Sequence, residues 1–246
     1  MVKAASNLSS GHRNDTRPSI ILIAGFGDNA SMFDGLARTH LADDYRLVPL
    51  DLPGFGAPPL DTEATLRNLA QVVVDKAKET GSEIIVAHSV ASIIATLAAQ
   101  NPDSPLNTII SLEGNITAED AYFSGTAADH DNPLSFRTGF LGRLDEMGRT
   151  EPIIRRYREE VSKADALALW QLGTDARRFS SEHVPGEILE NAAKVTYIYS
   201  TQNCPDSTLR WLEKSQMARI VLDNATHWVS VDQPDLLADK IIEALN

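Results

Sequence analysis

The sequence is poor in cysteine and in basic residues. Its 246 residues contain one cysteine, Cys204, so the chain can form neither an internal disulfide nor a cysteine-based zinc cage. Lys and Arg number 22 against 34 Asp and Glu, which gives a net charge of −12. Nucleic acids and anionic membrane surfaces repel an acidic protein, so we expect neither of them as a partner.

Long apolar runs are also missing. No stretch approaches the roughly 20 apolar residues that a membrane-spanning helix needs. Residues 1–17 are polar and are expected to form a flexible tail, and the stretch from Met1 to Pro18 lacks the apolar block of a signal peptide. These absences favour a cytoplasmic location.

Signals for a cofactor are absent as well. The stretch Gly25-Phe26-Gly27 lacks the third glycine and the spacing that a dinucleotide site needs, and no phosphate-binding glycine loop is found elsewhere. No group of residues has the spacing of metal ligands. We therefore expect neither a cofactor nor a metal.

What the sequence does contain is a regular alternation of short apolar runs and amphipathic stretches. The predicted strands lie at 19–24, 45–50, 84–87, 107–112, 195–199 and 218–222, and the predicted helices at 31–41, 62–80, 91–100 and 233–245. Thr62 could cap the second of these helices and Gly81 could end it. Strands that alternate with helices are joined by right-handed crossovers, which makes them parallel. The pattern predicts an α/β fold with a mostly parallel sheet of about six strands.

One region departs from this alternation. Residues 116–190 contain no convincing strand, and their periodicity predicts helices over about 134–147 and 151–172, with breaks at Gly148–Glu151 and Gly173. The region follows the strand that ends at Leu112. We expect residues 18–115 and 191–246 to form the core, with 116–190 inserted as a helical unit.

The run Ile84-Ile-Val-Ala-His-Ser-Val-Ala91 carries the strongest chemical signal. A buried strand passes directly into a helix, and Ser89 lies at the corner. Ala87 and Ala91 flank it, and a turn this tight requires small residues at those two positions. The turn raises the serine oxygen above the sheet edge and aims the first helical N–H groups at whatever the serine attacks.

This turn resembles the nucleophile elbow of the α/β-hydrolase superfamily, whose usual pattern is Gly-x-Ser-x-Gly; here alanine replaces both glycines. The resemblance extends over nearly the whole chain from about residue 18, and includes the Gly25-Phe26 loop, Asp51-Leu-Pro-Gly-Phe-Gly56 and the late His227. It implies a doubly wound sheet with a helical cap, here inserted after Leu112. The family usually has two further strands before the first one found here.

A serine hydroxyl needs a histidine as its base, and that histidine needs an acid to orient it. His227 fits the first role, because it follows the last predicted strand, where the family has its catalytic histidine. His88 is next to Ser89 in sequence, so its side chain should point elsewhere, and it is interpreted as structural. The acid is less certain. The family's commonest position falls in Ser200-Thr-Gln-Asn203, which has no carboxylate, so Glu113 is favoured and Asp206 is the alternative.

The resemblance also implies an oxyanion hole formed by the backbone N–H groups of Phe26 and Val90. Phe26, Trp170 and Trp228 are candidate substrate-binding side chains. The predicted protein is a metal-free, carboxylesterase-like serine hydrolase acting on a small molecule that contains a carboxylic ester, lactone or thioester, through an acyl-enzyme at Ser89. The alternatives are a C–C bond hydrolase or acyltransferase with the same triad, and a non-catalytic ligand-binding member of the fold.

Overall fold

Six parallel strands form the central sheet in the order β2-β1-β5-β6-β7-β8. Their bounds are β1 Ser19–Ile23, β2 Arg46–Leu50, β5 Ile84–His88, β6 Thr108–Leu112, β7 Lys194–Tyr199 and β8 Ala218–Val221. The structure is a computed structural model and describes residues 16–246, so the tail expected over residues 1–17 lies almost wholly outside the described residues. The prediction of an α/β fold with a mostly parallel sheet of about six strands is confirmed.

The centre of the sheet is apolar on both faces. All five residues of β1 are buried, and Ile20 pairs with Leu47 of β2 on one side and with Ile84 of β5 on the other. A strand covered on both faces needs a continuous apolar run, which explains the Ser-Ile-Ile-Leu-Ile sequence of β1. Two short strands, β3 (Leu52–Pro53) and β4 (Gly56–Ala57), form a separate pair.

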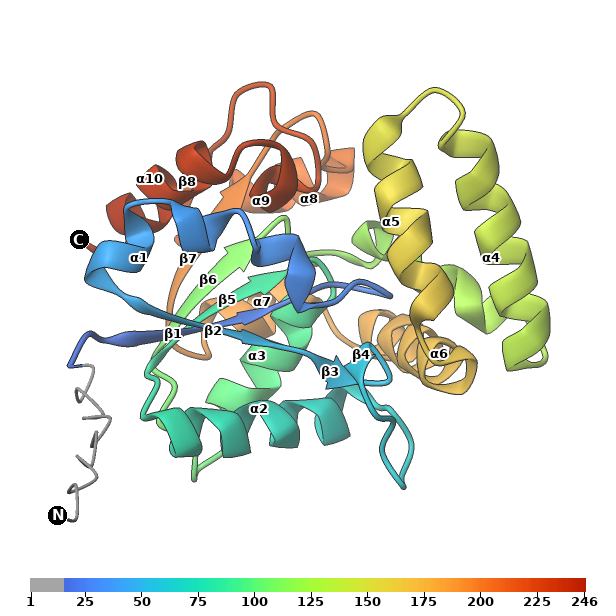
Figure 1. The fold of residues 1–246 in the computed structure, drawn as a ribbon, viewed down its shortest axis with the longest axis horizontal. Helices are drawn as coiled ribbons and strands as arrows, with labels where there is room; N and C mark the ends of the chain where they lie inside the picture. The colour runs from blue at the N-terminus through green and yellow to red at the C-terminus, as the bar shows by residue number, and fades with distance from the viewer. Residues whose placement is uncertain (1–15) are drawn as a thin grey trace, which may run out of the picture.

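Helices cover both faces of the sheet (Figure 1). α2 (Leu66–Thr80) and α3 (Ala91–Ala99) lie on one face, and α1 (Leu41–Asp44) and α10 (Pro234–Leu245) lie on the other. Two further short helices, α8 (Asp206–Leu212) and α9 (Val229–Asp232), belong to the C-terminal part of the core.

The ends of α2 follow from its capping residues. Its first turn is capped by Thr65, whose side chain accepts a hydrogen bond from Asn68 N, so the helix begins later than the predicted Thr62. It ends as predicted at Gly81, whose φ of 66° is left-handed and suits glycine.

The single helix predicted over 31–41 is wrong. The chain there forms two 3-10 turns, η1 (Ala30–Phe33) and η2 (Leu36–Arg38), followed by α1. Thr39 is extended, with φ −94° and ψ 166°, which interrupts any continuous helix, and its hydroxyl donates to Leu36 O instead.

Between β6 and β7 the described chain forms helices only. They are η3 (Ala118–Ala121), η4 (Ser124–Asp129), α4 (Pro133–Met147), α5 (Pro152–Lys163), α6 (Ala166–Glu182) and α7 (Pro185–Glu190). Residues 116–190, called the helical insertion below, place α4, α5 and α6 beyond the carboxyl ends of the strands (Figure 1). Across residues 16–246 no helix combines the length and the apolar character needed to cross a membrane.

The predicted break at Gly173 is wrong, because α6 runs through it. A Cβ at Gly173 would lie 2.5 Å from Ala127 Cβ, so this glycine permits close packing rather than ending a helix. The observed break comes earlier, at Ala164–Asp165, where the Asp165 side chain caps α6 by accepting from Ala168 N at 2.8 Å.

Candidate active site

Ser89 occupies the corner between β5 and α3. Its φ of 54° is left-handed, and its N–H donates to Leu112 O of the neighbouring strand at 2.9 Å. The backbone of the β1 loop passes very close, since a Cβ added at Gly25 would lie 2.9 Å from Ser89 Cβ. The turn is therefore fixed by neighbours on both sides, with the serine half-buried at its tip.

Glu113 directly follows β6, and only 2% of its side chain is exposed. Its Oε1 accepts hydrogen bonds from Ser200 N at 2.7 Å and from Asn203 Nδ2 at 3.0 Å. Its Oε2 lies 3.7 Å from His227 Nδ1. One carboxylate oxygen is thus held by the loop after β7, and the other faces the imidazole.

His227 lies in the loop between β8 and α9, and 13% of its side chain is exposed. Its Nδ1 is buried and has no hydrogen-bond partner, so the Glu113 carboxylate is the charged group it faces. Asn203 ties the two loops together, because the same Nδ2 that donates to Glu113 also donates to Ala225 O at 3.2 Å.

Left-handed backbone marks the three loops that converge here. Among residues 16–246, the non-glycine residues with positive φ are Ser89 at 54°, Glu113 at 50° and Asn224 at 55°. Each lies just after a strand of the main sheet, and Asn224 lies three positions before His227. Because strained non-glycine backbone clusters at functional sites, this sheet edge is a candidate functional site.

His88 packs against His227, and its side chain lines the Ser89 cavity instead of pointing elsewhere as the sequence suggested. Its Nε2 donates to His227 O at 2.8 Å, and the two rings lie 4.6 Å apart. Complete burial, with the nearby His227 as a second cause, lowers the pKa of His88 well below its usual value. His88 is therefore a neutral ring that holds the His227 loop against the elbow.

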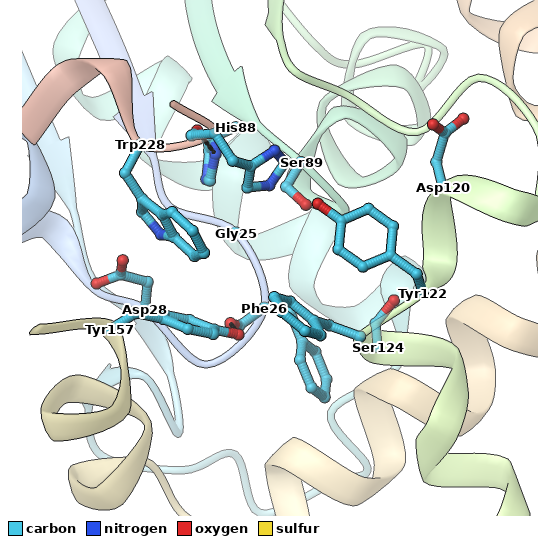
Figure 2. A pocket seen from close by; sticks show the side chains of 12 residues that line it. Gly25, Phe26, Asp28, His88, Ser89, Asp120, Tyr122, Ser124, Tyr157 and Trp228 are labelled. Carbon is cyan, nitrogen blue, oxygen red and sulfur yellow. Dashed lines mark hydrogen bonds between the residues drawn. The ribbon is translucent and has the colours of Figure 1, made fainter. Parts of the chain in front are cut away.

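Ser89 and His227 line one small cavity, together with Gly25, Phe26, Asp28, His88, Asp120, Tyr122, Phe123, Ser124, Tyr157 and Trp228 (Figure 2). The space open to the centre of a water molecule is about 20 Å³, little more than one water occupies. Of the three predicted substrate-binding side chains, Phe26 and Trp228 line this cavity. Trp170 does not, since its Nε1 donates to His130 O at 3.0 Å.

Phe26 lines the cavity and Val90 directly follows Ser89, and the backbone N–H groups of both are free. Within the described chain neither donates to a protein acceptor, and Val90 begins the first turn of α3. Unpaired N–H groups at a helix start attract negative charge. The Asp206 alternative lies elsewhere: it is exposed at the first residue of α8 and does not line the cavity.

Comparison with known proteins identifies the family of this chain. The family model described as the alpha/beta hydrolase family matches residues 20–240. The chain belongs to the alpha/beta hydrolase family. No curated protein sequence matches the chain significantly.

Solved structures of other alpha/beta hydrolases have the same fold as this one. A thermophilic esterase from Thermogutta terrifontis is 17% identical, with a TM-score of 0.72 over 93% of this chain and 89% of that one. An esterase from Exiguobacterium antarcticum is 15% identical, with a TM-score of 0.70 over 92% and 91%. An enol-lactonase from Burkholderia xenovorans is 16% identical, with a TM-score of 0.70 over 96% and 94%. At these identities the likeness establishes the fold alone.

Two tyrosines of this alpha/beta hydrolase were not predicted as site residues. Tyr157, on α5, donates its hydroxyl to Phe26 O at 2.6 Å, and burial raises its pKa well above the usual value. Tyr122 follows η3, and its hydroxyl faces Ser89 (Figure 2). Burial of its hydroxyl end, with the Glu113 charge as a lesser cause, also raises the pKa of Tyr122. The sequence did contain a signal for Tyr157: it lies within the apolar stripe of α5, and a buried phenol needs a hydrogen-bond partner.

Two carboxyl groups line the same cavity. Asp28 pairs with Arg156 of α5 and accepts from Asn29 N at 2.9 Å, and Asp120 accepts from Thr208 Oγ1 at 2.6 Å. Burial raises the pKa of both carboxyl groups. Among residues 16–246, no three His, Cys, Asp or Glu side chains gather as a metal site would require.

The one cysteine lies near this site. Cys204 follows Asn203 and is half-buried, with its Sγ 3.9 Å from the Tyr197 hydroxyl. Burial raises the pKa of Cys204 to about 12, with the Glu113 charge as a second cause.

Proposed function

We propose that this alpha/beta hydrolase is a serine hydrolase that cleaves carboxylic esters, with Ser89 as nucleophile, His227 as base and Glu113 as acid. One observation carries the proposal: the buried Glu113 carboxylate faces His227 Nδ1, and His227 shares a cavity with Ser89. Lactones and thioesters present the same carbonyl chemistry to this arrangement.

In the proposed reaction, Ser89 Oγ attacks the carbonyl carbon and its proton passes to His227 Nε2. Glu113 keeps the proton of Nδ1 in place and stabilises the imidazolium that forms. The Nδ1–Oε2 separation of 3.7 Å exceeds hydrogen-bond length, and such contacts commonly shorten once substrate is bound. The free N–H groups of Phe26 and Val90 bind the oxyanion.

Collapse of this intermediate breaks the carbonyl carbon–oxygen bond to the alcohol. His227 returns its proton to the leaving oxygen, and the acyl group stays on Ser89. A water then gives its proton to His227 and attacks the acyl carbon, which releases the carboxylic acid and restores the serine.

The test compares the wild type with Ser89→Ala on p-nitrophenyl acetate, with folding checked by circular dichroism. Loss of the nucleophile should lower kcat by about 10⁴-fold or more. A fluorophosphonate probe should label the wild type and leave Ser89→Ala unlabelled. Equal turnover by both proteins, or a folded wild type that neither turns over nor labels, would reject the proposal and favour a ligand-binding role.

A further inference from the structure

A groove larger than the Ser89 cavity lies beside His227. The space open to the centre of a water molecule is about 380 Å³ in the groove, against about 20 Å³ in the cavity. The groove is formed by the start of α5 and the loops that follow β7 and β8. Its lining includes Met147, Ile153, Ile154, Gln202 and Asn224.

The two spaces share one wall. Tyr122, Phe123, His227 and Trp228 line both of them. The residues that line the cavity but not the groove are Gly25, Phe26, Asp28, His88, Ser89, Asp120, Ser124 and Tyr157. Tyr122 is the most exposed part of the shared wall, at 37%. Its hydroxyl is directed at Ser89 (Figure 2).

The proposed reaction assigns a different part of the ester to each space. His227 must return its proton to the leaving alcohol, so the alcohol lies on the His227 side, where the groove is. The carbonyl oxygen points at Phe26 N and Val90 N, so the acyl group lies in the smaller cavity, where the space open to the centre of a water molecule is only about 20 Å³ and a short acyl chain is favoured.

The charged residues around each space restrict the charge that the acyl group and the alcohol can carry. Asp120 lines the acyl cavity, Asp28 is already paired with Arg156, and neither Lys nor Arg is among the lining residues, so this cavity offers no free cation to an acyl group that carries its own carboxylate. Glu151 brings a negative charge to the groove, and no Lys or Arg lines it. Met147 and Ile153 give this lining apolar surface, and Gln202 and Asn224 give it amides, a lining that suits an uncharged alcohol of mixed polarity.

We propose that the substrates are acetate-sized esters of bulky, uncharged alcohols, and that Tyr122 sets the acyl limit as the wall between cavity and groove. This inference rests on the proposed function. It assigns the alcohol to the groove beside His227 and the acyl group to the cavity beside Phe26.

The first experiment varies one half of the ester at a time, using the purified full chain. With benzyl alcohol held constant, kcat/KM should fall about 30-fold from acetate to butyrate, because the longer chain has no room in the cavity. With acetate held constant, kcat/KM should rise about tenfold from ethyl to 2-phenylethyl ester, because the groove adds apolar contact.

Two variants test the assignment of the spaces. Tyr122→Ala opens the wall and should lower the acetate preference over butyrate about tenfold. Ile153→Trp fills the groove and should lower kcat/KM for 2-phenylethyl acetate about tenfold, with ethyl acetate changed less than about twofold. Leu134→Trp is the matched control, because Leu134 is 71% exposed on α4 and lines neither space; it should change neither ratio.

The outcomes separate the two proposals. Ser89-dependent hydrolysis that is as fast on butyrate as on acetate, or a Tyr122→Ala variant with unchanged acyl preference, overturns this inference and leaves the proposed function standing. A wild type that hydrolyses none of the esters and does not react with the fluorophosphonate probe rejects both.

Discussion

The core loops and the helical insertion both reach the cavity, but they hold their residues differently. Ser89 and Glu113 are fixed by left-handed backbone and by buried hydrogen bonds between neighbouring strands. The insertion reaches the site through side chains, notably the Tyr157 hydroxyl on Phe26 O and the pair between Arg156 and Asp28. Rigid elements are suited to precise catalytic geometry, so we expect the chemistry to depend on the core and substrate choice on the insertion.

Of the changes to core residues other than Ser89, removal of the Glu113 charge should lower kcat the most. Glu113→Gln keeps the shape of the side chain but cannot stabilise a charged His227, so kcat should fall about 10³-fold with KM changed little. Asp206→Asn is the control and should retain nearly full kcat, since Asp206 is exposed on α8. The reverse result, with Asp206→Asn impaired and Glu113→Gln active, would move the acid to Asp206.

Loosening Glu113 without removing its charge should cost less. Asn203→Ala removes the amide that donates to both Glu113 and Ala225 O, so kcat should fall about tenfold as the carboxylate loses alignment with His227. The neighbouring exposed Thr201→Ala should leave kcat unchanged. A value for Asn203→Ala equal to that of Thr201→Ala would show that Ser200 N alone suffices to hold the acid.

Cutting the insertion's link to the core should have a smaller effect. Tyr157→Phe removes the hydrogen bond to Phe26 O and should lower the free energy of unfolding by about 1 kcal/mol. We expect kcat/KM to fall about fivefold, because the Phe26 N–H loses part of its support. Tyr45→Phe is the comparison, because Tyr45 directly precedes β2 and does not line the cavity. Equal kcat/KM for the two variants would show that the Tyr157 hydroxyl does not support the Phe26 N–H.

The last prediction concerns pH and stability rather than catalysis. Below pH 6.5 the unfolded chain takes up a proton at His88 that the folded protein resists, because burial lowers the pKa of this histidine. The free energy of unfolding should therefore fall as the pH falls below 6.5, by at most about 1.4 kcal/mol per pH unit from this residue.

Denaturant titrations at pH 7.5, 6.5 and 5.5 would measure this slope. His88→Gln keeps an amide donor near His227 O but has no proton to gain, so it should show a shallower loss than the wild type. His183→Gln, at an exposed position, is the control and should follow the wild type. A His88→Gln slope identical to that of the wild type would contradict the assignment of a neutral, buried His88.

The sequence was informative where local pattern decides structure. Alternating apolar runs predicted all six strands of the sheet, and the tight strand-to-helix corner singled out Ser89. The helix break predicted at Gly173 was wrong, because a glycine that permits close packing against Ala127 looks the same in sequence as one that ends a helix. The broken turns over 31–41 depend on an extended Thr39, which local propensity does not show.

The remaining site residues depend on contacts between distant segments. Sequence spacing alone could not choose between Glu113 and Asp206, because the path of the loop after β7 decides which carboxylate meets His227. In the structure that loop brings Asn203 to Glu113, so the amide stands in the region where the family more commonly has its acid. Tyr122 and Tyr157 reach the cavity only through the packing of the insertion against the β1 loop.

The chemistry of Cys204 makes this chain convenient for site-directed labelling. With the pKa of its one thiol raised to about 12, very little thiolate is present at neutral pH, and maleimide and iodoacetamide dyes react with thiolates. A second cysteine placed on the surface of α5 would therefore take up a fluorophore over a low background. The emission of that dye could then report, in real time, whether α5 changes position against the core when an ester is added.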